Sequence, residues 1–291
     1  MRVIANPEAG GGRARRNAER VEALLVQEAI PHEIAWSRDS ADVARLVERA
    51  VASDERPVVV GGDGTVGLAA GTLAHSGVPL GIVPSGRGND LARVLGIPTD
   101  PDAAMRVILD GSTTRIDLGE ANGRRFVGIA SLGFDSDANR IANEARLLRG
   151  SPVYAYAALR AFIGWKPASF QVACAGMEPE VYEGWSVAIA NNSAYGGGMR
   201  IAPNARLDDA LFDVVMVSGH DRLRFAGMLP SIYRGGHLRS PDVKVVRASS
   251  VEVDADRPFT VFADGDALCE LPMTAEVIPS AVSLFTPREG R

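Results

Sequence analysis

The first third of the chain alternates short apolar runs with longer amphipathic stretches, and this alternation constrains the fold more than any other feature. The apolar runs are RVIAN, HEIAW, PVVVGG and PLGIVPSG, and the stretches between them lie at 13–29, 41–52 and 68–75. Strands and helices that follow one another in this order build a parallel sheet covered by helices. We therefore expect an α/β domain, which binds ligands beyond the carboxyl ends of its strands.

After about residue 115 the pattern changes to alternating apolar and polar residues, as in RRFVGIASLG, WSVAIANN, LFDVVMV and PFTVFADGD. Such runs, separated by turn residues, predict an antiparallel β-sandwich. A chain of 291 residues is also too long for one comfortable core. We expect an α/β domain at 1–116, with 280–291 as a candidate segment to complete it, followed by a β-sandwich domain at 117–279.

The bulk properties favour small-molecule partners and exclude general binding of nucleic acid. The net charge is −5, which gives no overall electrostatic attraction to a polyanion. No apolar run is long enough to span a bilayer, and MRVIANP leads into a strand instead of a signal peptide. Cys174 and Cys269 are far apart and lack metal-type spacing. We expect a cytoplasmic protein that touches a membrane at most at its surface.

Three glycine-rich loops, NPEAGGG, GGDGT and PSGRGND, follow the predicted strands. Gly61, Gly62 and Gly64 lack a Cβ, so the backbone can bring its N–H groups close to an anion. Thr65 is expected to begin the next helix, where its hydroxyl caps the helix or meets a phosphate oxygen. No P-loop, dinucleotide-binding or protein-kinase signature occurs. The residues alone therefore predict a phosphate loop that contains one acid, Asp63.

An acid among phosphates has two explanations. Asp63 takes part in phosphoryl transfer if a divalent cation lies between it and the phosphates, or if it handles the proton of an attacking hydroxyl. Alternatively, it is a turn residue that accepts hydrogen bonds from its own loop. The motif GGDGT alone does not separate these two interpretations.

Five motifs in order resemble the diacylglycerol kinase catalytic family, the soluble bacterial lipid kinases related to sphingosine kinases. They are NPEAGGG, GGDGT, PSGRGNDLAR, GGGMRIAPNARLDDALFDVV and ADGD, and they extend from Asn6 to about Leu271. GGDGT is shared with NAD kinases, whereas the combination of all five is specific. The resemblance implies an NAD-kinase-like α/β domain that binds ATP and a sandwich domain that binds a lipid.

The resemblance also implies which residues hold ATP. These are Asn6, Pro7, Gly10, Arg16, Gly61, Gly62, Asp63, Gly64, Thr65, Gly86, Arg87 and Asn89. Arg87 stands where the family usually has Thr, which removes a hydroxyl but adds a cation that can meet phosphate.

For catalysis the resemblance implies a proton relay of two acids, Asp117 and Asp266, beside Asp63. Asp266 is the base candidate and stands where the family usually has Glu. Two acids brought together from distant parts of the chain raise one another's proton affinity, which makes one of them a usable base near neutral pH.

A metal site is implied as well, in which Asp209 supplies a carboxylate and Arg206 and Leu211 supply carbonyl oxygens to Mg²⁺. Oxygen ligands of this kind suit a hard cation.

The sequence is therefore interpreted as an ATP- and Mg²⁺-dependent lipid kinase that phosphorylates a hydroxyl of a diacylglycerol-like or sphingoid-like lipid. We expect the apolar tail to lie along the sandwich and a helix predicted over 153–165, with transient contact at the inner face of the membrane. A homodimer is left open. Two alternative functions also stay open: an NAD kinase-like enzyme, and a non-catalytic lipid-binding protein on a decayed kinase fold.

Overall fold

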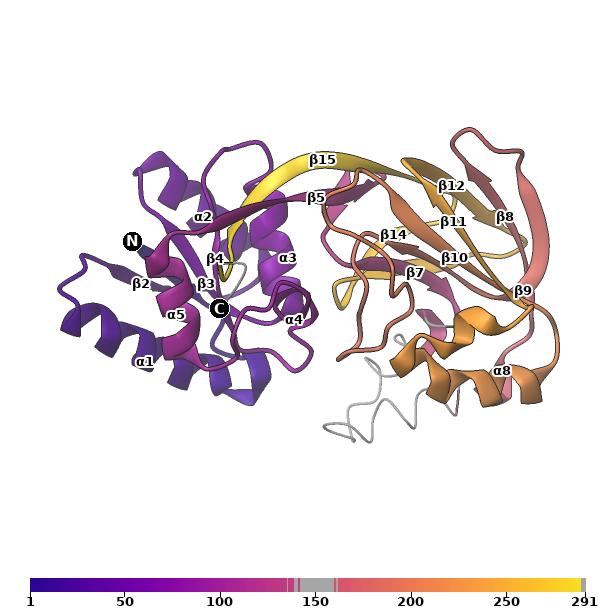
Figure 1. The fold of residues 1–291 in the computed structure, drawn as a ribbon, viewed down its shortest axis with the longest axis horizontal. Coiled ribbons are helices and arrows are strands. Elements are labelled where there is room, and N and C mark those ends of the chain that lie inside the picture. Colours follow the sequence, from indigo (N-terminus) through magenta and orange to yellow (C-terminus); the bar gives the residue numbers. More distant parts are fainter. Residues whose placement is uncertain (135, 139–140, 142–159, 161, 289–291) are drawn as a thin grey trace.

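Two parts make up the fold, an N-terminal part of strands and helices and a C-terminal part built mainly from antiparallel strands (Figure 1). The computed structural model describes residues 1–134, 136–138, 141, 160 and 162–288. Most of the helix expected over 153–165 therefore lies outside the described residues.

The N-terminal part is a parallel sheet with helices on both faces. Its strands are β1 (Arg2–Ala5), β2 (Glu33–Trp36), β3 (Pro57–Gly61) and β4 (Gly81–Pro84), in the spatial order β2-β1-β3-β4. Its helices are α1 (Arg13–Gln27), α2 (Ser40–Ala52), α3 (Asp63–Thr72), α4 (Asp90–Val94) and α5 (Pro101–Asp110), with a short 3-10 helix η1 (Ala9–Gly11). Helix α1 packs with α5, and α2 packs with α3. Right-handed crossovers in this strand order bring α1 to one face of the sheet and α2 with α3 to the other.

Side-chain caps mark the start of two of these helices. Asp39 accepts the Asp42 N–H at 2.8 Å at the start of α2, and Asp100 accepts the Ala103 N–H at 3.0 Å at the start of α5. Helix α3 begins at residue 63, five residues before the predicted stretch at 68–75, because the glycine loop leads directly into the helix. The glycine loop and the helix start are therefore one continuous element.

The C-terminal part is an antiparallel assembly. Its strands are β5 (Thr113–Ala121), β6 (Arg124–Phe126), β7 (Ile129–Gly133), β8 (Ala168–Cys174), β9 (Glu180–Ala190), β10 (Phe212–Ser218), β11 (Val243–Ala248), β12 (Ser250–Ala255), β13 (Thr260–Ala263), β14 (Asp266–Glu270) and β15 (Met273–Phe285). Its helices are α8 (Arg222–Met228) and the 3-10 helices η2 (Leu229–Arg234) and η3 (Gly236–Arg239). The described strands follow the order β14-β13-β7-β9-β8-β12-β15-β5-β6, and β10 joins β9 to β11.

Burial along these strands explains the sequence pattern. Strand β8 alternates between buried and more exposed residues, as the period of two predicts. The second half of β9 is buried throughout, because alternate residues pack into two different core clusters, Val187 and Ile189 into one and Ala188 and Ala190 into the other. This architecture, an α/β part followed by an antiparallel sandwich-like part, confirms the fold class predicted from the sequence.

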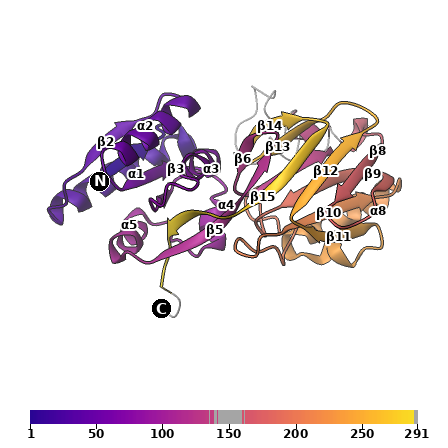
Figure 2. The ribbon, with the colours of Figure 1, turned by 90° about the horizontal axis from the view of Figure 1, so that it is seen from above.

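Strands β5 and β15 connect the two parts, as both Figure 1 and Figure 2 show. They pair from Ala121 with Ala275 in the sandwich to Thr113 with Phe285 at the N-terminal part. Leu284 at the end of β15 forms a parallel bridge with Leu80, just before β4, and is fully buried in the N-terminal core. The last strand of the chain therefore contributes to both parts.

Among the described residues, no helix has both the length and the apolar character needed to cross a lipid bilayer.

Candidate functional site

Three loops meet in direct backbone contact beyond the carboxyl ends of β1, β3 and β4. A Cβ on Gly86 would lie 2.4 Å from the Gly62 Cα, and a Cβ on Gly10 would lie 2.2 Å from the Ser85 carbonyl oxygen. Side chains do not fit at such distances, so glycine is required at both positions. The predicted loops NPEAGGG, GGDGT and PSGRGND are therefore one contiguous backbone surface.

Polar side chains hold the three loops together. The Asn6 amide donates to the Thr65 hydroxyl at 3.3 Å, and the Arg13 guanidinium donates to the Gly86 carbonyl at 3.0 Å. The Gly86 N–H donates to the Asn89 side-chain oxygen at 2.8 Å. Asn89 has a left-handed backbone conformation with φ of 52°, which Asn tolerates better than most residues. Several of the predicted ATP-binding residues are thus brought together by contacts among themselves.

A hollow lies at this junction. It is lined by Gly61, Gly62, Asp63, Val66, Ile82, Pro84, Asn89, Leu91 and Ala92. No side chain caps the N-terminus of α3, whose first-turn N–H groups lie at the same place. Free N–H groups and the positive end of a helix dipole attract phosphate, so the geometry fits the predicted phosphate loop.

Asp63 is the first residue of α3, and its carboxylate accepts two backbone hydrogen bonds. One oxygen accepts the Asn89 N–H at 2.8 Å and the other accepts the Asp90 N–H at 2.6 Å. The embedded acid thus fixes the start of α4 and with it the loop PSGRGND. Each carboxylate oxygen keeps further acceptor capacity, so the predicted part of Asp63 in phosphoryl transfer stays a prediction.

Asp90 connects this loop to the C-terminal part and was not among the predicted site residues. Its carboxylate accepts the Gly197 N–H at 2.9 Å. Burial raises the pKa of the Asp90 carboxyl group, and the negative charge of Asp63 raises it further. Because Gly197 belongs to the triple-glycine segment before β10, the contact joins the two parts beside the nucleotide loops.

Two acids of the sandwich, Asp264 and Asp266, lie against the first turns of α3. A Cβ on Gly67 would lie 2.7 Å from an Asp264 carboxylate oxygen, and a Cβ on Gly64 would lie 2.9 Å from an Asp266 carboxylate oxygen. Glycine at these two helical positions therefore allows the acids to approach. The predicted base candidate Asp266 is exposed and makes no hydrogen bond or ion pair within the described part of the chain.

Asp264 has the most perturbed carboxyl group near the site. Its oxygens accept the Val127 and Gly128 N–H groups, both at 2.8 Å. Removal from water raises the pKa of the Asp264 carboxyl group to about 6, and the negative charges of Asp63 and Asp266 add to the effect. The two hydrogen bonds oppose this rise and keep the turn before β14 in place.

Asp117, the predicted relay partner of Asp266, is buried on β5, and its carboxylate is hydrogen-bonded to backbone groups. Its carboxylate accepts the Ala210 N–H and the Ser280 N–H, both at 2.7 Å. Asp266 is not among its hydrogen-bond partners. These contacts tie the loop before β10 to the irregular pairing in the middle of β15. The proton relay therefore remains an implication of the resemblance.

The predicted basic residues Arg16 and Arg87 are exposed, and Pro7 is half-buried. Within the residues that the structure describes, neither guanidinium makes a hydrogen bond or an ion pair. Arg87 directly follows Gly86, at the contact between the loops. Its charge is thus available to a ligand phosphate.

Side chains at the predicted Mg²⁺ site have protein partners, and the predicted role of the Arg206 and Leu211 carbonyl oxygens stays a prediction. The Asp209 carboxylate forms an ion pair with Arg247, and it also accepts the Leu211 N–H at 3.1 Å. Arg206 pairs with Asp208. Across the described ranges, no three His, Cys, Asp or Glu side chains are grouped to hold a metal ion. The one carboxylate among the predicted ligands is thus already paired with a guanidinium, which weakens its attraction for a hard cation.

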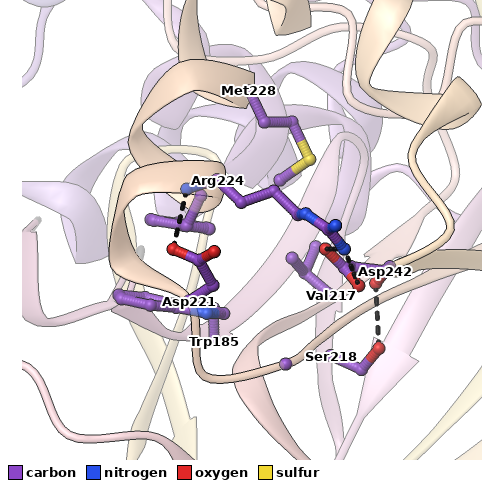
Figure 3. Close-up of a pocket in the computed structure, with 9 residues that line it drawn as sticks. Trp185, Val217, Ser218, Asp221, Arg224, Met228 and Asp242 are labelled. Carbon is purple, nitrogen blue, oxygen red and sulfur yellow. Dashed lines mark hydrogen bonds and ion pairs between the residues drawn. The ribbon is translucent and has the colours of Figure 1, made fainter.

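A second hollow lies on the sandwich beside α8 (Figure 3). Trp185 and Met228 line it together with an ion pair between Arg224 and Asp242, with nitrogen–oxygen distances of 3.1 and 3.2 Å. Asp221 caps α8 by accepting the Leu223 N–H at 2.9 Å. The charged side chains of this hollow thus have protein partners, and none of the predicted site residues lines it.

Sequence reasoning missed two acids of the site, Asp90 and Asp264. Asp90 was quoted only as part of PSGRGND, and Asp264 only as part of ADGD. The structure explains Gly67 by the 2.7 Å approach of Asp264.

Comparison with known proteins covers nearly the whole chain. The family model for the diacylglycerol kinase catalytic domain matches residues 1–121, and the model for the YegS C-terminal NAD kinase beta sandwich-like domain matches residues 128–286. A Mycobacterium tuberculosis protein named diacylglycerol kinase is 36% identical over 295 residues, which cover 99% of this chain and 95% of that protein. A Staphylococcus carnosus protein of the same name is 24% identical over 296 residues, covering 99% and 95% of the two chains.

Solved structures with the same fold include a diacylglycerol kinase from Bacillus anthracis. It superposes with a TM-score of 0.75 at 22% identity and covers 99% of this chain and 96% of its own. An NAD kinase from Archaeoglobus fulgidus, solved in complex with ATP, superposes with a TM-score of 0.54 at 15% identity, covering 99% and 95% of the two chains. At these identities the likeness concerns the fold alone.

Proposed function

The chain belongs to the diacylglycerol kinase catalytic domain family, and we propose that it transfers the γ-phosphoryl group of ATP to a hydroxyl group of a diacylglycerol-like or sphingoid-like lipid. Mg²⁺ enters with ATP as part of that substrate. One observation carries the proposal: a carboxylate of the sandwich, Asp266, lies against the first turn of α3, where the glycine loops are built for phosphate.

The nucleotide phosphates lie against the three loops, with the N-terminus of α3 as their anion site. A hydrogen bond joins Asn6 and Thr65 at the edge of this surface, and Gly86 allows its loop to lie directly against the backbone of Gly62. The guanidinium groups of Arg16 and Arg87, which have no partner among the described residues, neutralise phosphate charge. Asp63 keeps the loop PSGRGND in register through its two backbone hydrogen bonds.

Asp266 receives the proton of the acceptor. As the lipid hydroxyl oxygen bonds to the γ-phosphorus, its proton passes to the Asp266 carboxylate, and the bond between that phosphorus and the bridging oxygen of ADP breaks. The absence of a hydrogen bond to Asp266 within the described residues supports this role, since the carboxylate is open to a substrate hydroxyl. Asp264 fixes the turn that carries Asp266.

In this proposal Asp117 positions a loop of the sandwich and does not itself transfer the proton. Both of its carboxylate oxygens are occupied by backbone N–H groups, which favours a role in holding the loop at Ala210 over direct proton transfer.

The lipid tail lies along the sandwich, and the enzyme meets the membrane transiently from the cytoplasmic side. Two large apolar side chains support such contact: Leu223 is 84% exposed and Ile163 is 68% exposed. Arg222 brings their segments together by donating to the Ile163 carbonyl at 3.3 Å and to the Trp165 carbonyl. Apolar side chains next to a guanidinium are suited to an anionic lipid surface.

The test is steady-state kinetics of Asp266→Asn with ATP, Mg²⁺ and a short-chain diacylglycerol. Loss of a general base costs about 100- to 10,000-fold in rate, so kcat falls by that factor while ATP affinity is retained. Glu252→Gln is the matched control, because Glu252 is an exposed sandwich acid without a hydrogen bond or ion pair to a described residue. Equal kcat for Asp266→Asn and Glu252→Gln would remove Asp266 from the mechanism.

A further inference from the structure

Arg247, on β11, lies between two carboxylates at the loop that precedes β10. It is paired across the strands with Asp213 of β10, and its Nε donates to an Asp213 carboxylate oxygen at 3.2 Å. Its Nη2 meets the Asp209 carboxylate. The Asp213 side chain is 5% exposed and the Asp209 side chain 19% exposed, so neither charge is well solvated by water.

The loop that Arg247 holds is part of the support for Asp117. Within this loop the Leu207 carbonyl accepts the Asp117 N–H at 2.6 Å, and the Ala210 N–H donates to the Asp117 carboxylate at 2.7 Å. Ala210 has a left-handed conformation with φ of 58°, which a non-glycine residue adopts only when its surroundings fix it. Asp209, next to Ala210, is the residue that Arg247 binds.

Two nearby carboxylates of low exposure require a positive charge between them. Arg247 contacts both carboxylates, so its charge lies where water reaches them poorly. A guanidinium meets this need through its fork of fixed N–H donors, whereas Mg²⁺ needs near-octahedral oxygen ligands. At Asp209 the Leu211 N–H, a donor, already occupies one carboxylate oxygen.

We propose that Arg247 takes the place of the Mg²⁺ ion that the family resemblance assigns to this loop, and that it acts as a positioning residue for Asp117. The protein therefore holds the loop at 206–211 without a divalent cation. The protein then needs Mg²⁺ only as the partner of the nucleotide, and this consequence rests on the proposed function. The effect of Arg247 on stability does not depend on the proposed function.

The first experiment is thermal unfolding of the full chain in millimolar MgCl₂ and in excess EDTA, without nucleotide. The wild-type Tm is expected to be the same in both conditions. Arg247→Ala exposes an unpaired, nearly buried Asp213, so its Tm in EDTA falls by about 5 °C or more. Because the vacated position now lies between two carboxylates, MgCl₂ recovers part of this loss.

Two further variants separate this result from a general loss of surface charge. Arg247→Lys keeps the charge but loses the fork, so its Tm lies between those of wild type and Arg247→Ala and does not respond to MgCl₂. Lys244→Ala, on the same strand, removes an exposed ion pair with Glu180 and leaves Tm nearly unchanged in both conditions. If Arg247→Ala does not fold, the wild-type comparison and Arg247→Lys still decide the question.

The proposal is overturned by a wild-type Tm that rises with MgCl₂, which would reveal a divalent-cation site in the intact protein. It is overturned equally by an Arg247→Ala variant with wild-type Tm in EDTA. A kinetic readout adds a distinct check: once ATP is saturated with Mg²⁺, additional free Mg²⁺ increases kcat of Arg247→Ala but not of wild type. If no kinase activity is found at all, the proposed function fails while the thermal comparison remains valid.

Discussion

Replacing Gly86 with alanine perturbs the contact on which the nucleotide site depends. The new Cβ would lie 2.4 Å from the Gly62 Cα, whereas carbon atoms in ordinary contact are about 3.5–4.0 Å apart. The loops PSGRGND and GGDGT must therefore separate by about 1 Å. Since a misplacement of about 1 Å costs about 100-fold in rate, kcat/KM for ATP is expected to fall by about that factor. Overpacking also lowers the free energy of unfolding by about 1–3 kcal/mol.

Two other glycines provide a graded comparison for this prediction. A Cβ on Gly62 would lie 3.0 Å from the Gly86 Cα, so Gly62→Ala is expected to reduce kcat/KM less than Gly86→Ala does. A Cβ on Gly227 meets nothing within 4 Å, and Gly227→Ala in α8 should leave kcat/KM unchanged. Steady-state kinetics in ATP, with circular dichroism to verify folding, measures all three. A folded Gly86→Ala variant with the kcat/KM of wild type would refute the inferred role of the loop contact.

Two further predictions concern charge. Burial raises the pKa of the Asp264 carboxyl group from its ordinary value of 3.8 to about 6 in the folded protein, so the folded state binds the extra proton. The free energy of unfolding therefore falls by about 3 kcal/mol as pH rises from about 4 through 6. Urea denaturation should show this fall in wild type but not in Asp264→Asn, and parallel curves for the two proteins would contradict it. Arg87→Thr removes a guanidinium without a partner among the described residues, so KM for ATP should rise about 10-fold with unchanged Tm, and an unchanged KM would exclude Arg87 from phosphate binding.

The fold class was predictable because its signals are local. Alternating strands and helices identified the parallel sheet, and the period of two identified the sandwich. Glycines marked the three loops NPEAGGG, GGDGT and PSGRGND. Each loop follows a strand of the parallel sheet, and parallel topology brings the carboxyl ends of these strands to one edge. The long strand β15, of which only the final part was expected to return, was harder to predict because its partners change along its length.

The partners of the acids could not be predicted, because they depend on contacts between distant residues. Asp63 binds the backbone 26 and 27 positions away, and Asp264 binds it 136 and 137 positions away. Asp117 accepts an N–H 163 positions away. A motif gives the residue type and its loop but not which N–H groups fold against it. For the same reason Arg247, which lies in no motif, could not be connected with Asp209.

Transfer of the labelled γ-phosphate tests the central claim most directly. The protein is incubated with γ-labelled ATP, Mg²⁺ and a mixed lipid extract, in parallel with NAD, and Asp266→Asn serves as the control. The account predicts a labelled lipid with wild type and none with the control. Label in NADP would contradict the lipid kinase assignment in favour of an NAD kinase-like enzyme. No transfer to either acceptor despite measurable ATP binding would contradict catalysis itself and favour a non-catalytic lipid-binding protein.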